Sequence, residues 1–314
     1  MAPSRGPQPL ARSLHTTLSN HRGPVHVARY AKGTAKYILT GGQDRTVRLW
    51  NPTIGTEIKV YASHGYEVLS ISVAHDNSKF ASSGGDRSVF LWDVTTGVTI
   101  KRFSGHMGRV NAVDFNADAS VLASGSYDAT VRLWDLRSQS HVPIQILEEA
   151  KDAVQTIHVG PTSIITGSVD GHVRTYDLRK GQLRADYIGQ PVTAVVPTAD
   201  YTTYLATTLD STIRLMDAGT GKMLQSFKAD GYEVKNYRCR AVFGSEEATV
   251  VAGDEGGRVW AWDLLDGQVL RPNPPPRVHE KVIGWTEHHP TDPGEMVTAS
   301  ADGTVKVWRH PGKS

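Results

Sequence analysis

The sequence predicts an all-β fold, a ring of seven small antiparallel sheets known as a seven-bladed β-propeller. The first observation is a repeat, because segments such as TVRLWN and SVFLWD recur seven times along the 314 residues. The second is the period-2 alternation of apolar and polar residues in these segments, which is typical of β-strands. The third is the spacing of one aromatic position by 42, 42, 42, 40, 46 and 46 residues, at Trp50, Trp92, Trp134, Tyr176, Met216, Trp262 and Trp308.

Each copy of the repeat has room for four short strands. In the second copy the strand-like runs lie at residues 68–74, 79–83, 88–93 and 98–103, between clusters of Gly, Asp and Ser. One such sheet cannot bury both of its faces, so neighbouring copies must stack on each other as the blades of a propeller.

The two ends of the chain predict how the ring closes. The last copy stops at Trp308 after three strands, whereas the segment SLHTTL precedes His21 just as IKRF precedes His106. We therefore expect residues 12–19 to complete blade seven, residues 280–309, and to leave no open sheet edge. The expected propeller spans residues 12–309, with a disordered tail at 1–11 and a short C-terminal tail at 310–314.

A polar set recurs around the aromatic position. An aspartate stands six residues before it in six copies, at Asp44, Asp86, Asp128, Asp170, Asp210 and Asp302. In the first three copies a histidine stands 22 or 23 residues before the aspartate. We expect the imidazole to bridge carboxylate and indole in a buried chain. Because an active site is needed only once, the set is interpreted as a structural fastener of each blade, formed by His21, Asp44, Trp50, His64, Asp86, Trp92, His106, Asp128 and Trp134.

The later copies depart from this pattern. Tyr176 and Met216 replace the tryptophan, and Gly256 replaces the aspartate. Blades four to seven also show no histidine at the expected offset in this interpretation. We therefore expect apolar packing to hold these blades more than the polar chain does, and we expect them to open more easily.

The pattern GH…GxxD…WD, complete in GHMGRVNAVDFNADASVLASGSYDATVRLWD, resembles the WD-repeat β-propeller family over residues 12–309. The strings SHGYEVLSISVAHDNSKFASSGGDRSVFLWDV and LDSTIRLMDAGTGKMLQSF are similar to one group within it, the mitogen-activated protein kinase organizers. This resemblance implies a non-enzymatic scaffold for kinases of the ERK cascade that is also associated with the spliceosome and pre-mRNA splicing. It implies kinase-module components and spliceosomal proteins as partners, in the cytoplasm and the nucleus. Blade seven and the Pro-rich segment before it match this group poorly.

Composition argues against several other classes of protein. Lys and Arg number 34 against 32 for Asp and Glu, so the net charge of +2 gives no general affinity for nucleic acid or anionic lipid. The single cysteine, Cys239, excludes an intramolecular disulfide and Cys-based zinc sites. No apolar run approaches the ~18 residues that span a bilayer. We expect a soluble intracellular protein with no membrane association, monomeric itself and part of larger assemblies.

Motifs for catalysis and metal binding are missing. The sequence contains no GxxxxGK[ST], GxGxxG, HExxH or GxSxG motif, so we expect no enzyme activity and no cofactor. His288 and His289 are adjacent, and on a strand they would point to opposite faces, which disfavours chelation. Asp254 and Glu255 supply only two carboxylates and are interpreted as part of a turn. No metal site is predicted.

Two segments remain open to alternative interpretations. The first 43 residues carry six basic residues and no acidic one. These residues either form a basic lip that binds RNA phosphate or an acidic partner, or are dispersed over the surface. RNA contact is therefore expected to be at most indirect or through this N-terminal region. The segment RPNPPPRV, residues 271–278, is either a stiff connection between blades or a ligand for an aromatic groove.

One rim of the predicted ring carries candidate partner-binding residues. Residues that flank each first strand, or that precede the turn aspartate, project on one face of a propeller. The candidates there are Tyr66, Glu67, Arg109, Tyr127, Tyr232 and Glu233. Tyrosine and arginine dominate binding hot spots, so this rim is suited to a peptide or a protein edge. Blade packing is the structural alternative for the same residues.

A second binding mode is also consistent with the sequence. The strings ATVRLWDLR and GHVRTYDLR resemble the WD-x-R box with which some propellers dock on the adaptor of cullin-type ubiquitin ligases. Arg137 and Arg179 would be the docking residues in that substrate-receptor role. The structural alternative is that each arginine extends over a strand end and pairs with a neighbouring acid.

Overall fold

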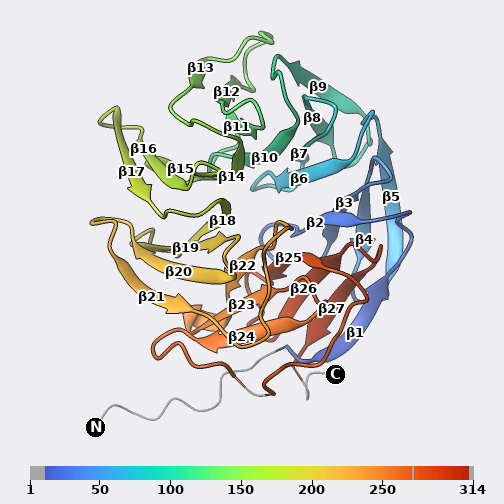
Figure 1. Cartoon of the computed structure of the whole chain (residues 1–314). Helices are drawn as coiled ribbons and strands as arrows, with labels where there is room; N and C mark the ends of the chain where they lie inside the picture. Colours follow the sequence, from blue (N-terminus) through green and yellow to red (C-terminus); the bar gives the residue numbers. More distant parts are fainter. Residues whose placement is uncertain (1–10, 271, 311–314) are drawn as a thin grey trace.

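The computed structural model describes residues 11–270 and 272–310 and consists of seven sheets around a common centre (Figure 1). Blades one and two contain β2 (Val25–Tyr30), β3 (Ile38–Gly42), β4 (Thr46–Asn51) and β5 (Thr56–Ala62), then β6 (Val68–Val73), β7 (Lys79–Gly84), β8 (Ser88–Asp93) and β9 (Thr99–Ser104). Blades three and four contain β10 (Val110–Phe115), β11 (Val121–Ser126), β12 (Val131–Asp135) and β13 (Gln145–Leu147), then β14 (Val154–Val159), β15 (Ser163–Ser168), β16 (His172–Asp177) and β17 (Gln182–Tyr187).

The remaining blades follow the same antiparallel order. Blade five contains β18 (Val192–Pro197), β19 (Thr203–Thr208), β20 (Thr212–Asp217) and β21 (Met223–Phe227). Blade six contains β22 (Ala241–Phe243), the 3-10 turn η1 (Ser245–Glu247), β23 (Thr249–Gly253) and β24 (Val259–Asp263). Blade seven contains β25 (Ile283–His288), β26 (Glu295–Ser300) and β27 (Val305–Arg309) with β1 (Ser13–Leu18). The prediction of a seven-bladed β-propeller is confirmed.

The N-terminal strand closes the ring, as the sequence predicts. Strand β1 pairs antiparallel with β27, with Ser13 opposite Arg309 and Leu18 opposite Val305, and the two strands lie side by side in Figure 1. Residues 1–10 and 311–314, which contain most of the two predicted tails, lie outside the described residues. Ala11 belongs to the fold rather than to a tail, because it is only 3% exposed and packs in a cluster with Trp308.

Blade six differs from the prediction of four strands in every copy. Its regular sheet has three strands, and beyond β24 only the isolated bridges Trp262–Val269 and Arg258–Arg277 continue the pairing. Residues 272–276 of this stretch read PNPPP, and proline has no N–H to donate to a strand ladder. The Pro-rich segment therefore covers the outer edge of blade six as a loop.

The core lies between adjacent sheets. The largest cluster joins blades seven, one and two through residues such as Val305, Trp50 and Phe80. Close approach of neighbouring blades depends on glycine at one repeated position of the second strand, because a Cβ on Gly41 would lie 2.6 Å from Val68 of the next blade and a Cβ on Gly253 would lie 2.4 Å from Ile283. In the part of the chain that the structure describes, no helix is long and apolar enough to cross a bilayer.

Candidate functional site

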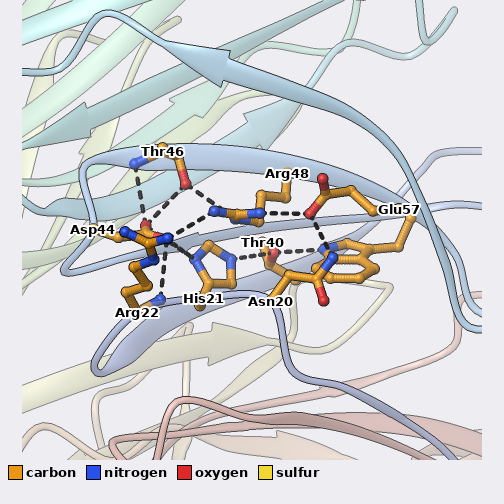
Figure 2. A network of polar contacts seen from close by, with 9 residues as sticks. Asn20, His21, Arg22, Thr40, Asp44, Thr46, Arg48 and Glu57 are labelled. Carbon is orange, nitrogen blue, oxygen red and sulfur yellow. Dashed lines mark hydrogen bonds and ion pairs between the residues drawn. The ribbon is translucent and has the colours of Figure 1, made fainter.

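A network of buried polar side chains fastens blade one (Figure 2). The imidazole Nδ1 of His21 lies 3.0 Å from Asp44, and its Nε2 lies 2.7 Å from the hydroxyl of Thr40. The indole Nε1 of Trp50 donates to the same hydroxyl at 2.8 Å. Because a carboxylate only accepts, Nδ1 carries the ring proton, and the Thr40 hydroxyl donates to Nε2. His21, Asp44 and Trp50 thus belong to one hydrogen-bonded chain, in which Thr40 stands between imidazole and indole.

The same chain recurs in blades two and three with serine in place of threonine. His64 contacts Asp86 at 2.7 Å and Ser82 at 2.7 Å, and Trp92 donates to Ser82 at 2.8 Å. In blade three the corresponding residues are His106, Asp128, Ser124 and Trp134. The linking hydroxyl stands four residues before the aspartate in all three blades, so the sequence contained a signal for it that our interpretation missed.

The fastener aspartates are held in their ionised form. Asp128 accepts from His106 Nδ1 at 2.9 Å, the Met107 amide at 2.8 Å, the Thr130 amide at 3.0 Å and the Thr130 hydroxyl at 2.7 Å. Burial alone would raise the pKa of Asp128, but the bonds from His106 and Thr130 outweigh it and hold the pKa well below its ordinary value. The fastener therefore stabilises the fold when its aspartate is ionised.

Blade seven corrects the expectation that blades four to seven lack the histidine. His279 lies 2.9 Å from Asp302 and 2.9 Å from the hydroxyl of Thr298, to which Trp308 donates at 2.9 Å. The separation of His279 from Asp302 is 23 residues, the same as that of His21 from Asp44. His279 therefore stands at the expected offset, and the expectation is wrong for blade seven.

Blades four and five also keep a polar fastener, with arginine as the cation. Arg174 pairs with Asp170 at 2.7 Å, and Arg214 pairs with Asp210 at 2.6 Å. Both arginines stand four residues after the aspartate, on the strand that ends at the aromatic position. Blades four and five therefore keep an ion pair at the aspartate although they have no histidine there, and the expected larger share of apolar packing stays a prediction.

Blade six uses a different arrangement. Asp254, not position 256, accepts from the indole of Trp260 at 2.7 Å and from the Arg258 amide at 2.7 Å. Tyr232 packs edge-on against Trp260 and Trp262, with ring centroids 6.0 and 5.1 Å apart. The turn interpretation of Asp254 is confirmed, but this aspartate also has a structural role.

Tyr232 is therefore not a rim residue, which corrects the prediction. The residue is 3% exposed, and its ring packs against Trp260 and Trp262. The repeated tetrapeptide GYEV, at residues 65–68 and 231–234, suggested equivalent surfaces. The physical difference is the preceding residue, because His64 fills the interior of blade two, whereas blade six has Asp230 at that point.

The other predicted rim tyrosines are exposed at one end of the ring, which we call the entry face because the first strand of each blade begins there. Tyr66 is 61% exposed and Tyr127 is 57% exposed. The guanidinium of Arg109 lies over the ring of Tyr127, 5.2 Å from its centroid. This contact holds an aromatic face and a cation together on loops of blade three.

Three further residues of the entry face are Glu67 and Glu233, which the sequence predicts, and Tyr237, which it does not. Glu67 is half-buried, and its carboxylate lies against Gly85, whereas Glu233 is exposed and pairs with Lys235 at 3.1 Å. Tyr237, which the sequence interpretation missed, is 57% exposed and follows two residues whose amides bind Glu255. We define the tyrosine rim as Tyr66, Arg109, Tyr127 and Tyr237.

Arg137 and Arg179 lie at the opposite end of the ring, beyond the ends of β12 and β16. The Arg137 side chain is 74% exposed and pairs with Asp118 at 2.8 Å, which is the structural alternative foreseen for it. Arg179 is exposed, and its backbone amide donates to Asp177 at 2.9 Å. The two arginines therefore share one face, separate from the tyrosine rim.

The basic N-terminal residues do not form one lip. Arg22 precedes β2, Lys32 and Lys36 follow it, and a strand separates them. Arg29 points into the ring centre, where it pairs with Glu287 at 3.1 Å. Arg5 lies outside the described residues. The distribution agrees with dispersed surface charge, the alternative to an RNA-binding lip.

No cluster of three metal-ligating side chains occurs among the residues that the structure describes. His289 Nδ1 accepts from the Thr291 and Asp292 amides at 3.2 and 2.8 Å, so this histidine is engaged in a turn. The Pro-rich segment contributes Pro272, Pro275 and Pro276 to an apolar groove that Trp308 also lines. This segment therefore packs on its own chain between blades six and seven.

Comparison with known proteins agrees with the fold. Residues 12–51, 55–93, 97–135 and 279–309 match the family described as "WD domain, G-beta repeat". The chain is 48% identical to WD repeat domain-containing protein 83 of Homo sapiens, over 98% of this chain and 95% of the relative. The chain is 48% identical to the protein of that name in Danio rerio, over 95% of this chain and 92% of the relative. It is 30% identical to the homolog in Dictyostelium discoideum, over 94% of this chain and 98% of the relative.

Proposed function

The chain belongs to the WD repeat domain-containing protein 83 family, the mitogen-activated protein kinase organizers, and on that basis we propose that it is a non-enzymatic scaffold that assembles multiprotein complexes. The proposed partners are components of the ERK kinase module and proteins of the spliceosome, in the cytoplasm and the nucleus. Scaffolding requires no catalytic step, because tethering two weakly binding proteins raises their effective concentration to roughly the millimolar range.

The observation that carries the proposal is the tyrosine rim. Large aromatic side chains are normally buried for stability, yet Tyr66 and Tyr127 expose 61% and 57% of their surface on loops that make no blade core. Tyrosine combines a large contact area with a hydroxyl for hydrogen bonding, and Arg109 beside Tyr127 adds a cation. The rim is suited to an extended peptide or a protein edge that carries apolar and acidic side chains.

The charge distribution supports protein partners over RNA. The net charge is +2, and the basic residues near the N-terminus lie on both faces of the ring rather than in one patch. We therefore propose that any association with RNA is indirect, through proteins of the splicing machinery. The propeller would act as a subunit that holds other proteins together.

The alternative function is a substrate receptor of a cullin-type ubiquitin ligase. The exposure of Arg137 and Arg179 on one face, in the adjacent blades three and four, favours this alternative. Arg137 already pairs with Asp118, and docking would have to compete with that contact. The alternative uses the face opposite the tyrosine rim, so the two functions can be separated by variants.

Affinity purification of the endogenous protein from separated nuclear and cytoplasmic extracts, with and without RNase, tests the proposal. We expect ERK-module proteins in the cytoplasmic fraction and RNase-resistant splicing factors in the nuclear fraction. A cullin-ligase adaptor whose recovery is lost in Arg137→Ala/Arg179→Ala would favour the alternative. Recovery of none of these three classes would refute both assignments.

A further inference from the structure

The centre of the ring contains a cavity with an unusual set of charges. Its volume is about 100 Å³, and residues from the innermost part of all seven blades line it. Three of the lining residues are arginines, Arg29, Arg238 and Arg240, whereas no aspartate or glutamate is among the described residues that line it. The three guanidinium groups on the wall of this partly buried cavity carry positive charge that no other lining residue neutralises.

The nearby carboxylates do not complete it. Glu287 accepts from Arg29 at 3.1 Å and from Arg240 at 2.9 Å, so one carboxylate serves two cations. Asp114 is occupied by the Ser72 hydroxyl at 2.8 Å and the Val159 amide at 3.0 Å. Both acids are therefore engaged, and the three arginines exceed them by one positive charge.

Arg238 is the cation without a carboxylate partner among the described residues. Its guanidinium crosses the ring from blade six and donates to the backbone oxygen of Asn111 in blade three at 3.0 Å. Burial, together with repulsion from Arg240 and Arg29, lowers the pKa of Arg238 to about 10. At neutral pH the Arg238 guanidinium is still protonated, and no carboxylate among the described residues pairs with it.

A second, independent feature of the same wall is an unused donor. Trp285 lines the cavity, is 3% exposed, and its indole Nε1 has no hydrogen-bond partner in the described part of the chain. The guanidinium carbons of Arg240 and Arg29 lie 4.4 and 5.1 Å from the centre of the Trp285 ring. A buried N–H without an acceptor costs free energy, which an acceptor inside the cavity would recover.

We propose that the central cavity binds a small free oxyanion of the phosphate or sulfate type. The lining residues supply guanidinium groups and an indole N–H, from which an oxyanion accepts hydrogen bonds, and Glu287 balances only part of the positive charge. A volume of about 100 Å³ leaves room for an inorganic ion of this kind. Bound there, the ion would join blades one, six and seven and stabilise the ring.

The test is a titration of the full-length protein with inorganic phosphate, followed by ³¹P NMR and calorimetry at constant ionic strength in chloride. We expect saturable binding of one phosphate per chain and a melting temperature that rises with occupancy. Arg238→Met should weaken binding at least tenfold. Arg137→Met removes the same charge from an exposed site and serves as the matched control, with unchanged binding.

Further variants keep the test decisive if Arg238→Met does not fold. Trp285→Phe removes only the indole donor and should weaken phosphate binding several-fold. The proposal is overturned if wild-type protein shows no saturable binding up to about 10 mM phosphate, or if the Arg238 variant binds as well as wild type.

Discussion

Removal of the blade-three fastener by Asp128→Ala should destabilise the propeller by about 2–3 kcal/mol. The carboxylate is 10% exposed and accepts four hydrogen bonds, from His106, Met107 and two atoms of Thr130. Charge-assisted bonds contribute roughly 1.5–3 kcal/mol each, and an abandoned buried donor costs ~1–3 kcal/mol. Water can reach the backbone amides at the turn and replace part of the lost hydrogen bonding. The expected loss of stability is therefore close to that of one charge-assisted bond and one buried donor without an acceptor.

Urea unfolding followed by tryptophan fluorescence measures this change, and the midpoint should fall without a change in slope. Thermal unfolding should show a decrease in Tm of roughly 4–8 °C. Asp230→Ala is the matched control, since Asp230 is exposed and should change stability by less than about 0.5 kcal/mol. Equal stability of the two variants would refute the assignment of His106, Asp128 and Trp134 as a fastener.

Other consequences of the structure can be measured in the same way. Burial raises the pKa of Asp254, so Asp254→Asn should cost less than Asp128→Asn in urea unfolding, and the reverse order would contradict the different charge states. Because Asp128 and its counterparts have lowered pKa values in the fold, their contribution is complete above the unfolded-state value of about 4 and is lost as pH falls through and below it. Stability should therefore decrease from about pH 5 downwards, less steeply in Asp128→Ala; a pH-independent midpoint would exclude this linkage. Deletion of residues 1–18 removes β1 and exposes β27, and it should lower Tm far more than deletion of residues 1–10, whereas equal melting of both proteins would rule out ring closure by β1.

The fold was predictable because the repeat places the same residue types at nearly constant offsets. Trp50, Trp92 and Trp134 mark the third strand of their blades, and the four strands expected in blade two match β6 to β9 within about one residue at each end. Ring closure followed from counting strands at the two ends. These features depend on local pattern and on the number of copies, both of which a single sequence contains.

The predictions were wrong where a blade departs from the His–Asp–Trp pattern and other residue types pack near its aspartate. Tyr232 seemed equivalent to Tyr66, but without a histidine in blade six its ring packs inward against Trp260. The arginines of blades four and five pair with the aspartate from the third strand of their blade, four residues after it, so they do not share the offset of the histidine.

The charged cavity depends on long-range contacts that no local pattern contains. Arg238 and Asn111, for example, are 127 residues apart in the sequence but meet across the ring. Such contacts become visible only when the seven innermost strands are placed around one centre.

The most direct test of the scaffold assignment is partner recovery by a protein that lacks the tyrosine rim. Tyr66→Ala/Tyr127→Ala/Tyr237→Ala should keep the wild-type Tm and lose at least about tenfold in affinity for the proposed kinase-module or splicing partners. Tyr187→Ala, which removes a 72% exposed tyrosine from the outer strand β17, is the matched control and should bind normally. Undiminished affinity in the folded triple variant would contradict the assignment of the entry face as the interaction surface.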